Sequence, residues 1–210
     1  MRPPGLPPRR RMLCWLGAAL PAAGLAACSL GRAPRMDFHL LRDPGGDTPA
    51  VPGPAIDKVL LVASGGVPGL YDSDRMVFSV DGRSRSYFQF GHWGERPAQS
   101  LLPLAERRLA RSKRFRDVVI STSGVRGDLL LSLRLDELYL DTSIEPGQLN
   151  MMITAELIDW RKRDLLARRS FVQAAPVPQR DAGGLAEAAS RAMGVMLDEL
   201  VPWAAASAGA

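Results

Sequence analysis

The sequence holds few of the residues on which enzymes and disulfide-stabilised proteins depend. Its 210 residues include only two cysteines and two histidines. It lacks a Gly-x-Ser-x-Gly motif, a phosphate-binding glycine loop and clustered Cys/His metal ligands. Two serine-containing segments, "ASGG" and "STSG", have no histidine or acid at motif spacing and predict turns. We therefore expect a protein that is not an enzyme and uses no metal or cofactor; a periplasmic hydrolase is the disfavoured alternative.

A hydrophobic run long enough to span a membrane is also missing. The run Met12–Ala27 has 16 residues and contains Pro21, whereas a spanning helix needs about 20. Arg9, Arg10 and Arg11 precede the run, and small residues close it. This layout predicts a secretory signal peptide over residues 1–27, with a membrane-spanning helix as the alternative.

The sequence has little excess charge once this segment is set aside. The whole chain carries 27 basic and 22 acidic residues, a formal charge of +5. Four of the basic residues precede the hydrophobic run, and all the acids follow Cys28, so the remainder carries 23 basic and 22 acidic groups. A net charge of +1 gives no electrostatic basis for nucleic-acid binding.

Cys28 ends the segment Leu25-Ala26-Ala27-Cys28, which resembles the lipobox of bacterial lipoproteins. The resemblance implies cleavage before Cys28, a diacylglyceryl group on its thiol and an acyl group on its new amine. Cys14 would leave with the signal, so the mature chain would have no disulfide. By the sorting rule of enteric lipoproteins, Ser29 implies the outer membrane more than the inner one. Residues 28–35 would be a short tether.

The remaining residues predict a sheet-rich domain. Leu131, Leu133 and Leu135 alternate with polar residues, which is the period of a strand with one buried face. The segments with this or another strand signal are 36–42, 58–64, 75–80, 84–90, 115–121, 129–141, 150–160 and 165–174. Asp81-Gly82 predicts a hairpin turn, and the last three segments predict an antiparallel meander.

Two segments have helical periodicity. The first begins at Pro97 with a kinked first turn, or nearer Leu102 because Pro103 does not suit a helix interior. In this helix we place Arg107, Arg108 and Arg111 on the solvent side. The second covers about 184–203, with an apolar stripe of Leu185, Ala189, Ala192, Met193, Met196, Leu200 and Val201. The fold class is α+β: one domain, residues 36–204, whose mostly antiparallel sheet is covered on one face by two helices, before a flexible tail at 205–210.

The segment Gly69–Val119 resembles the ABC-type transport auxiliary lipoproteins, the family that includes PqiC. The matching pattern is a Tyr-Asp turn, an arginine before a strand, an aromatic pair, Trp-x-x-x-Pro, and a leucine-rich helix that ends in Ser-x-x-Phe-x-x-Val. These positions are Tyr71, Asp72, Arg75, Tyr87, Phe88, Trp93, Pro97, Leu101, Leu102, Leu109, Ser112, Phe115 and Val118. The sequence departs from the pattern at Tyr-Asp-Ser-Asp-Arg and at Pro103.

The resemblance implies a non-catalytic partner of an ABC permease and ATPase and of a membrane-anchored MCE-domain protein, which together move lipids or other hydrophobic molecules between membranes. A homo-oligomer is compatible with it. The alternatives are a stand-alone structural or envelope-assembly lipoprotein, and a domain that itself carries lipid between sheet and helices. Tyr71, Tyr87, Phe88 and Trp93 are either core residues or part of a docking surface. The basic residues 161–163, 168 and 169 are either a solvated hairpin tip or a contact for anionic headgroups.

Overall fold

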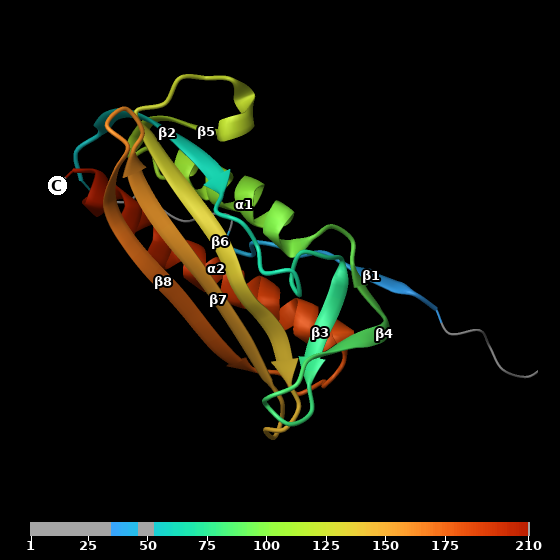
Figure 1. Cartoon of the computed structure of the whole chain (residues 1–210). Helices are drawn as coiled ribbons and strands as arrows, with labels where there is room; N and C mark the ends of the chain where they lie inside the picture. Colours follow the sequence, from blue (N-terminus) through green and yellow to red (C-terminus); the bar gives the residue numbers. More distant parts are fainter. Residues whose placement is uncertain (1–34, 46–52, 210) are drawn as a thin grey trace, which may run out of the picture. The chain divides into compact units, whose positions relative to one another are not determined.

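The structure is a computed structural model that describes residues 35–45 and 53–209. Contacts divide the chain between Arg35 and Met36, and the second unit is the one described below. The predicted signal peptide, Cys28 and Ser29 lie outside the described residues. The elements, shown in Figure 1, are β1 (Asp37–His39), β2 (Ile56–Ser64), β3 (Arg75–Ser79), β4 (Ser86–Trp93), α1 (Pro97–Arg111), β5 (Phe115–Ile120), β6 (Leu129–Asp141), β7 (Gln148–Asp159), β8 (Asp164–Pro176) and α2 (Ala182–Ala208).

The meander β6–β7–β8 forms the largest part of the sheet. β6 pairs with β7 antiparallel along its whole length, with Leu131 opposite Leu157, and β7 pairs with β8 in the same way. Along β6 the predicted alternation is confirmed: Leu131, Leu133 and Leu135 are buried on the core face.

The other edge of β6 is shared between two strands. Its first half pairs with β2 through Leu129–Leu133, and its end pairs with β3 through Leu140 and Asp141. Both pairings are parallel, as are those of β2 with β5 and of β1 with β4. The sheet is therefore mixed, with antiparallel meander and hairpin as predicted. The parallel pairings were not predicted, because they join strands separated by long connections.

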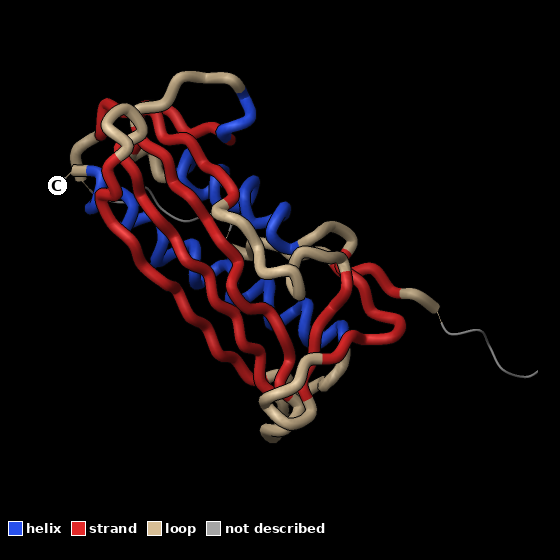
Figure 2. Tube along the Cα trace, in the orientation of Figure 1, coloured by secondary structure: helices blue, strands red, loops and turns tan. Residues whose placement is uncertain are grey.

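Both helices cover one face of this sheet, as Figure 2 shows, which confirms the predicted α+β class. The seven residues of the predicted apolar stripe of α2 are all buried. α2 also continues to Ala208, where a flexible tail from residue 205 was expected. That part of the expectation is corrected, because Ala204, Ala205 and Ala208 pack into the core and Lys58 Nζ donates to the Ala208 carbonyl at 3.1 Å.

α1 begins at Pro97 and contains Pro103, so the expected start near Leu102 is wrong. Proline suits the first helical position because its missing N–H has no partner there. Arg108 also differs from expectation: it is 1% exposed and lies on the core side of α1. Its position seven residues after Leu101 places it on the same helix face as the apolar residues.

The β3–β4 hairpin has a longer loop than a two-residue turn, since the strands end at Ser79 and resume at Ser86. Gly82 has a positive φ of 72°, which favours glycine. The Asp81 carboxylate accepts hydrogen bonds from the backbone N–H groups of Ser84 (2.7 Å) and Arg83 (2.9 Å) and from the Ser84 hydroxyl (2.8 Å). These bonds lower the pKa of Asp81 to about 2.

We expect Asp81→Ala to destabilise the domain at pH 7 and to have a smaller effect near pH 2. The folded-state pKa is depressed, so the stabilisation is present above the ordinary value of 3.8 and is lost as the pH falls toward 2. Urea unfolding at both pH values measures this difference. An equal loss of stability at pH 7 and pH 2 would contradict it.

Candidate functional site

Three of the motif residues meet in the core at one end of the sheet. Tyr71 is 8% exposed, Trp93 is 2% exposed, and Pro97 at the start of α1 is buried. All three line one small hollow together with Leu135 and Leu138 of β6. Backbone hydrogen bonds hold the surrounding loop, from Tyr71 N–H to the Pro68 carbonyl (2.8 Å) and from Trp93 N–H to the Asp74 carbonyl (2.7 Å). Tyr71, Trp93 and Pro97 therefore pack the loop before β3, the β3–β4 hairpin and α1 against one another.

Four other motif residues, Asp72, Arg75, Tyr87 and Phe88, lie nearer the surface. The guanidinium of Arg75 stacks over the Tyr87 ring at 3.8 Å, and Phe88 packs against Phe78 with ring centroids 4.8 Å apart. Asp72 pairs with Arg96 at 3.3 Å, and both are half exposed. The motif residues up to Pro97 thus divide into a buried joint (Tyr71, Trp93 and Pro97) and a partly exposed set consisting of Asp72, Arg75, Tyr87 and Phe88. The motif residues from Leu101 to Val118 are buried or half-buried.

A second arginine–aromatic cluster was missed in the sequence. The Arg85 guanidinium lies 3.6 Å over the Tyr139 ring, and its charge also acts on the Tyr71 hydroxyl. Burial raises the pKa of Tyr71, against the opposing effect of Arg85, and burial also raises the pKa of Tyr139. Tyr139 comes from β6 and Arg85 from the hairpin loop, so no local pattern in the sequence links them.

Arg108 is the centre of the most buried ionic network. Its Nε and Nη2 donate to the two carboxylate oxygens of Asp43 at 2.8 and 2.6 Å, and Nη1 donates to Asp198 of α2. Burial raises the pKa of Asp43, but bonds from Arg108 and from the Gly45 N–H outweigh it and hold the pKa below 3.8. A Cβ on Gly45 would lie 2.0 Å from Nη2 of Arg108, which explains the glycine. The network joins the segment after β1 to both helices.

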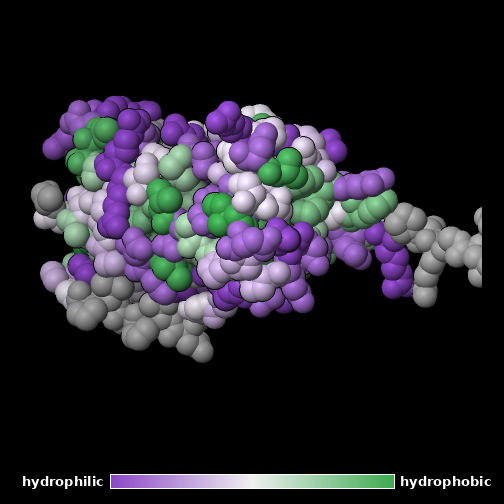
Figure 3. Space-filling model, turned by 90° about the horizontal axis from the view of Figure 1, so that it is seen from below, coloured by the Kyte–Doolittle hydropathy of each residue, from purple (hydrophilic) through white to green (hydrophobic). Residues whose placement is uncertain are grey.

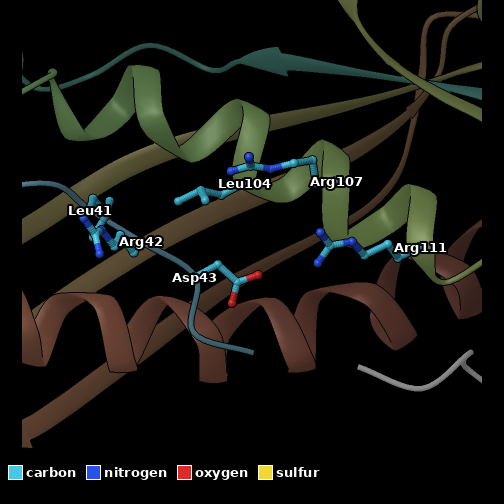
Figure 4. Close-up of a pocket in the computed structure, with 6 residues that line it drawn as sticks. All are labelled: Leu41, Arg42, Asp43, Leu104, Arg107 and Arg111. Atoms are coloured by element: carbon cyan, nitrogen blue, oxygen red, sulfur yellow. The ribbon is translucent and has the colours of Figure 1, made fainter. Parts of the chain in front are cut away.

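Beside Asp43 the surface has an open hollow of about 300 Å³. Figure 4 shows Asp43 between α1 and α2, with Arg107 and Arg111 of α1 and Arg42 of the preceding segment around it. Leu41 and Leu104 complete its lining. The one carboxylate in this lining, that of Asp43, accepts two hydrogen bonds from Arg108.

The basic residues at the β7–β8 hairpin make contacts typical of a solvated tip. Arg163 stacks over the Trp160 ring at 3.9 Å, Arg161 pairs with Asp128 at 2.5 Å, and Arg168 pairs with Glu156. Each of these three arginines therefore has a contact within the domain.

The described part of the chain contains no group of three or more His, Cys, Asp or Glu residues that could hold a metal ion. His92 lies 3.4 Å from Asp74, and His39 lies on the neighbouring strand β1, opposite Trp93. No helix within residues 35–45 and 53–209 is both long and apolar enough to cross a bilayer.

The model of the ABC-type transport auxiliary lipoprotein component family matches residues 39–201. The chain belongs to this family. The match includes every motif residue from Tyr71 to Val118, α1, the meander and α2 as far as Val201. Membership of this lipoprotein family associates the protein with the cell envelope and with an ABC-type transport system.

Solved structures share the fold of this auxiliary lipoprotein. Protein XCC0632 from Xanthomonas campestris, described under the family model DUF330, is 19% identical with a TM-score of 0.72, over 82% of this chain and 97% of that one. An uncharacterised protein is 11% identical with a TM-score of 0.60, over 80% of this chain and 99% of that one. No curated protein matches the sequence.

Proposed function

We propose that this auxiliary lipoprotein is a non-catalytic, periplasm-facing component of an MCE-associated ABC system that moves lipids or other hydrophobic molecules between the inner and outer membranes. The family match over residues 39–201 carries the proposal. The predicted partners are the MCE-domain protein, the permease and the ATPase of the same system.

The packing of the domain supports an auxiliary role rather than that of a lipid carrier. Between sheet and helices, Leu101, Ile153, Phe171, Met196, Leu197 and Leu200 line a hollow of only about 10 Å³. That volume holds at most about one water molecule. In the described structure this hollow has no room for an acyl chain, and we propose that a partner subunit carries the transported molecule.

The proposed anchor is Cys28, with a diacylglyceryl group on sulfur and an acyl group on nitrogen; no other cofactor is proposed. More than one acyl chain gives stable anchoring, where a single chain is marginal. Ser29 supports the outer membrane as the location.

We expect Cys28→Ala to lose incorporation of radiolabelled palmitate completely, because the thiol is the acylation site. Labelling of the wild-type and variant proteins in growing cells measures this. Ser29→Ala, which keeps the thiol, serves as the control and should label normally. Palmitate labelling of Cys28→Ala at the wild-type level would refute the anchor.

Affinity purification of the tagged full-length lipoprotein from crosslinked membranes tests the proposed partners. Recovery of an MCE or ABC subunit is the expected result. Purification of the lipoprotein without either subunit would instead support the alternative, a stand-alone structural or envelope-assembly lipoprotein.

A further inference from the structure

The first strand of the domain exposes an apolar face. Met36, Phe38 and Leu40 are 55, 64 and 53% exposed. Phe38 lies in β1, and Met36 and Leu40 flank the strand at the spacing of two residues that side chains on one side of a strand have. We call these three residues the β1 apolar face. Large apolar side chains exposed together mark an interaction site more often than single ones do.

The packing around β1 leaves this face open. β1 pairs only with β4 among the described strands, with Phe38 opposite His92, whose ring lies 5.9 Å away. The intervening residues, Asp37 and His39, instead line a hollow with the start of α2. The side of β1 that carries Asp37 and His39 therefore faces the start of α2 across this hollow, whereas Phe38 is 64% exposed.

The position of β1 in the chain identifies what this face meets. β1 lies at one end of the domain, opposite the end where α2 finishes (Figure 1). Only residues 29–35 separate Met36 from Cys28, a distance of at most about 30 Å when extended. In Figure 3 apolar surface, in green, extends to the end of the domain where the described chain begins. With lipid on Cys28, this face is the exposed apolar surface nearest to the bilayer along the chain.

The charges around the face fit a phospholipid surface. Residues 29–35 include Arg32 and Arg35 and no acid, and Arg42 follows the face. Basic residues beside an apolar segment favour anionic headgroups. Three carboxylates lie nearby. Asp37 is on the side of β1 opposite to the β1 apolar face, Asp43 forms an ion pair with Arg108, and Asp74 lies beside His92.

We propose that the β1 apolar face inserts into the headgroup region of the bilayer that holds the lipid anchor. The inference rests on the proposed lipidation of Cys28. A second contact beside the acyl chains fixes the domain in one orientation, with β1 toward the membrane and the C-terminal end of α2 away from it. Lipid anchoring combined with a protein–membrane contact is stronger than either alone.

A single fluorescent label tests the contact. In the mature protein the Cys28 thiol is consumed by the lipid and Cys14 is removed, so Phe38→Cys adds the one thiol to label. The matched control is Val172→Cys on β8, because Val172 is also 64% exposed and lies on another edge strand of the sheet. The full-length processed lipoproteins are reconstituted into phosphatidylethanolamine–phosphatidylglycerol vesicles, with or without lipids that carry a quencher in the upper acyl chain.

We expect the label at position 38 to shift its emission to the blue and to lose roughly half of it to the lipid quencher, while the label at position 172 changes little. A second variant labels position 36 through Met36→Cys, and adding Phe38→Ser should reduce the quenching there. Emission at position 38 that is shifted but not quenched would mean that protein, such as a second copy, covers the face, and would overturn the proposal.

Vesicle flotation separates this inference from the proposed anchor. Flotation of the lipoprotein without quenching at position 38 would overturn the membrane contact and leave the anchor standing. Failure to float would overturn the anchor, and the membrane contact with it. Flotation together with quenching at position 38 and not at position 172 supports both the anchor and the membrane contact.

Discussion

Replacing Arg108 by alanine is expected to lower the free energy of unfolding by about 3 to 5 kcal/mol. The substitution leaves the carboxylate of Asp43 in a mostly buried position without the two hydrogen bonds that neutralise it. It also separates α1 from Asp198 of α2. Because small domains are stable by only about 5 to 15 kcal/mol, this loss brings the protein close to unfolding. Urea denaturation of the wild-type and variant proteins measures the change.

Arg107→Ala is the matched control, since Arg107 is the neighbouring residue of α1 and is exposed. Its effect should stay within about 0.5 kcal/mol, as for most surface substitutions. Arg108→Lys should lie between the two, because lysine keeps the charge but cannot donate two parallel hydrogen bonds to one carboxylate. Equal stabilities of Arg107→Ala and Arg108→Ala would contradict the role of the buried pair.

The same pair predicts a dependence on pH. Because the folded-state pKa of Asp43 is lowered below 3.8, its contribution is complete above that pH and is lost as the pH falls through the folded-state value. The difference in stability between the wild-type protein and Arg108→Ala should therefore shrink below pH 3.8. A difference that stays constant from pH 7 to pH 2.5 would show that Arg108 acts through packing alone.

Trp93→Ala should lower the free energy of unfolding by a similar amount, about 3 to 5 kcal/mol, because its side chain is 2% exposed and fills the joint beside Tyr71 and Pro97. Thermal unfolding followed by circular dichroism measures this. Phe90→Ala in the same strand is the control: Phe90 is 38% exposed, so the loss should be much smaller.

The Trp93 result also separates the two interpretations of the aromatic cluster. A core role predicts that Trp93→Ala loses stability and complex formation together. An unchanged melting temperature with loss of the complex would instead place Trp93 in a docking surface. The partly exposed pair of Arg75 and Tyr87 is the better position for substitutions that aim at a partner without unfolding the domain.

Local patterns predicted most of the elements. The alternation of Leu131, Leu133 and Leu135 was sufficient for the meander, because a strand buried on one face has a period of two. The stripe from Leu185 to Val201 was sufficient for the last helix. The family, too, was recognised from an ordered set of motif residues, and the match over residues 39–201 confirms it.

Element boundaries and the roles of single residues were less predictable. Pro103 suggested a late helix start, but α1 is held by packing of Leu101, Leu104 and Ala105 on both sides of that proline. The small residues after Trp203 resembled a tail, yet alanines fit closely against the sheet and extend α2. In both cases burial outweighed local propensity.

The sequence by itself determined the class of the domain, the order of its elements, its family and the position of the predicted lipid anchor, because each of these depends on neighbouring residues in the chain. Only the tertiary structure decided which strands pair in parallel across long connections, that Trp93 is buried, and that Arg108 meets carboxylates 65 residues before it and 90 residues after it. Such contacts depend on how distant segments pack against each other, and no local period or spacing records them. The open side of β1 became visible for the same reason, since exposure depends on what the rest of the fold covers.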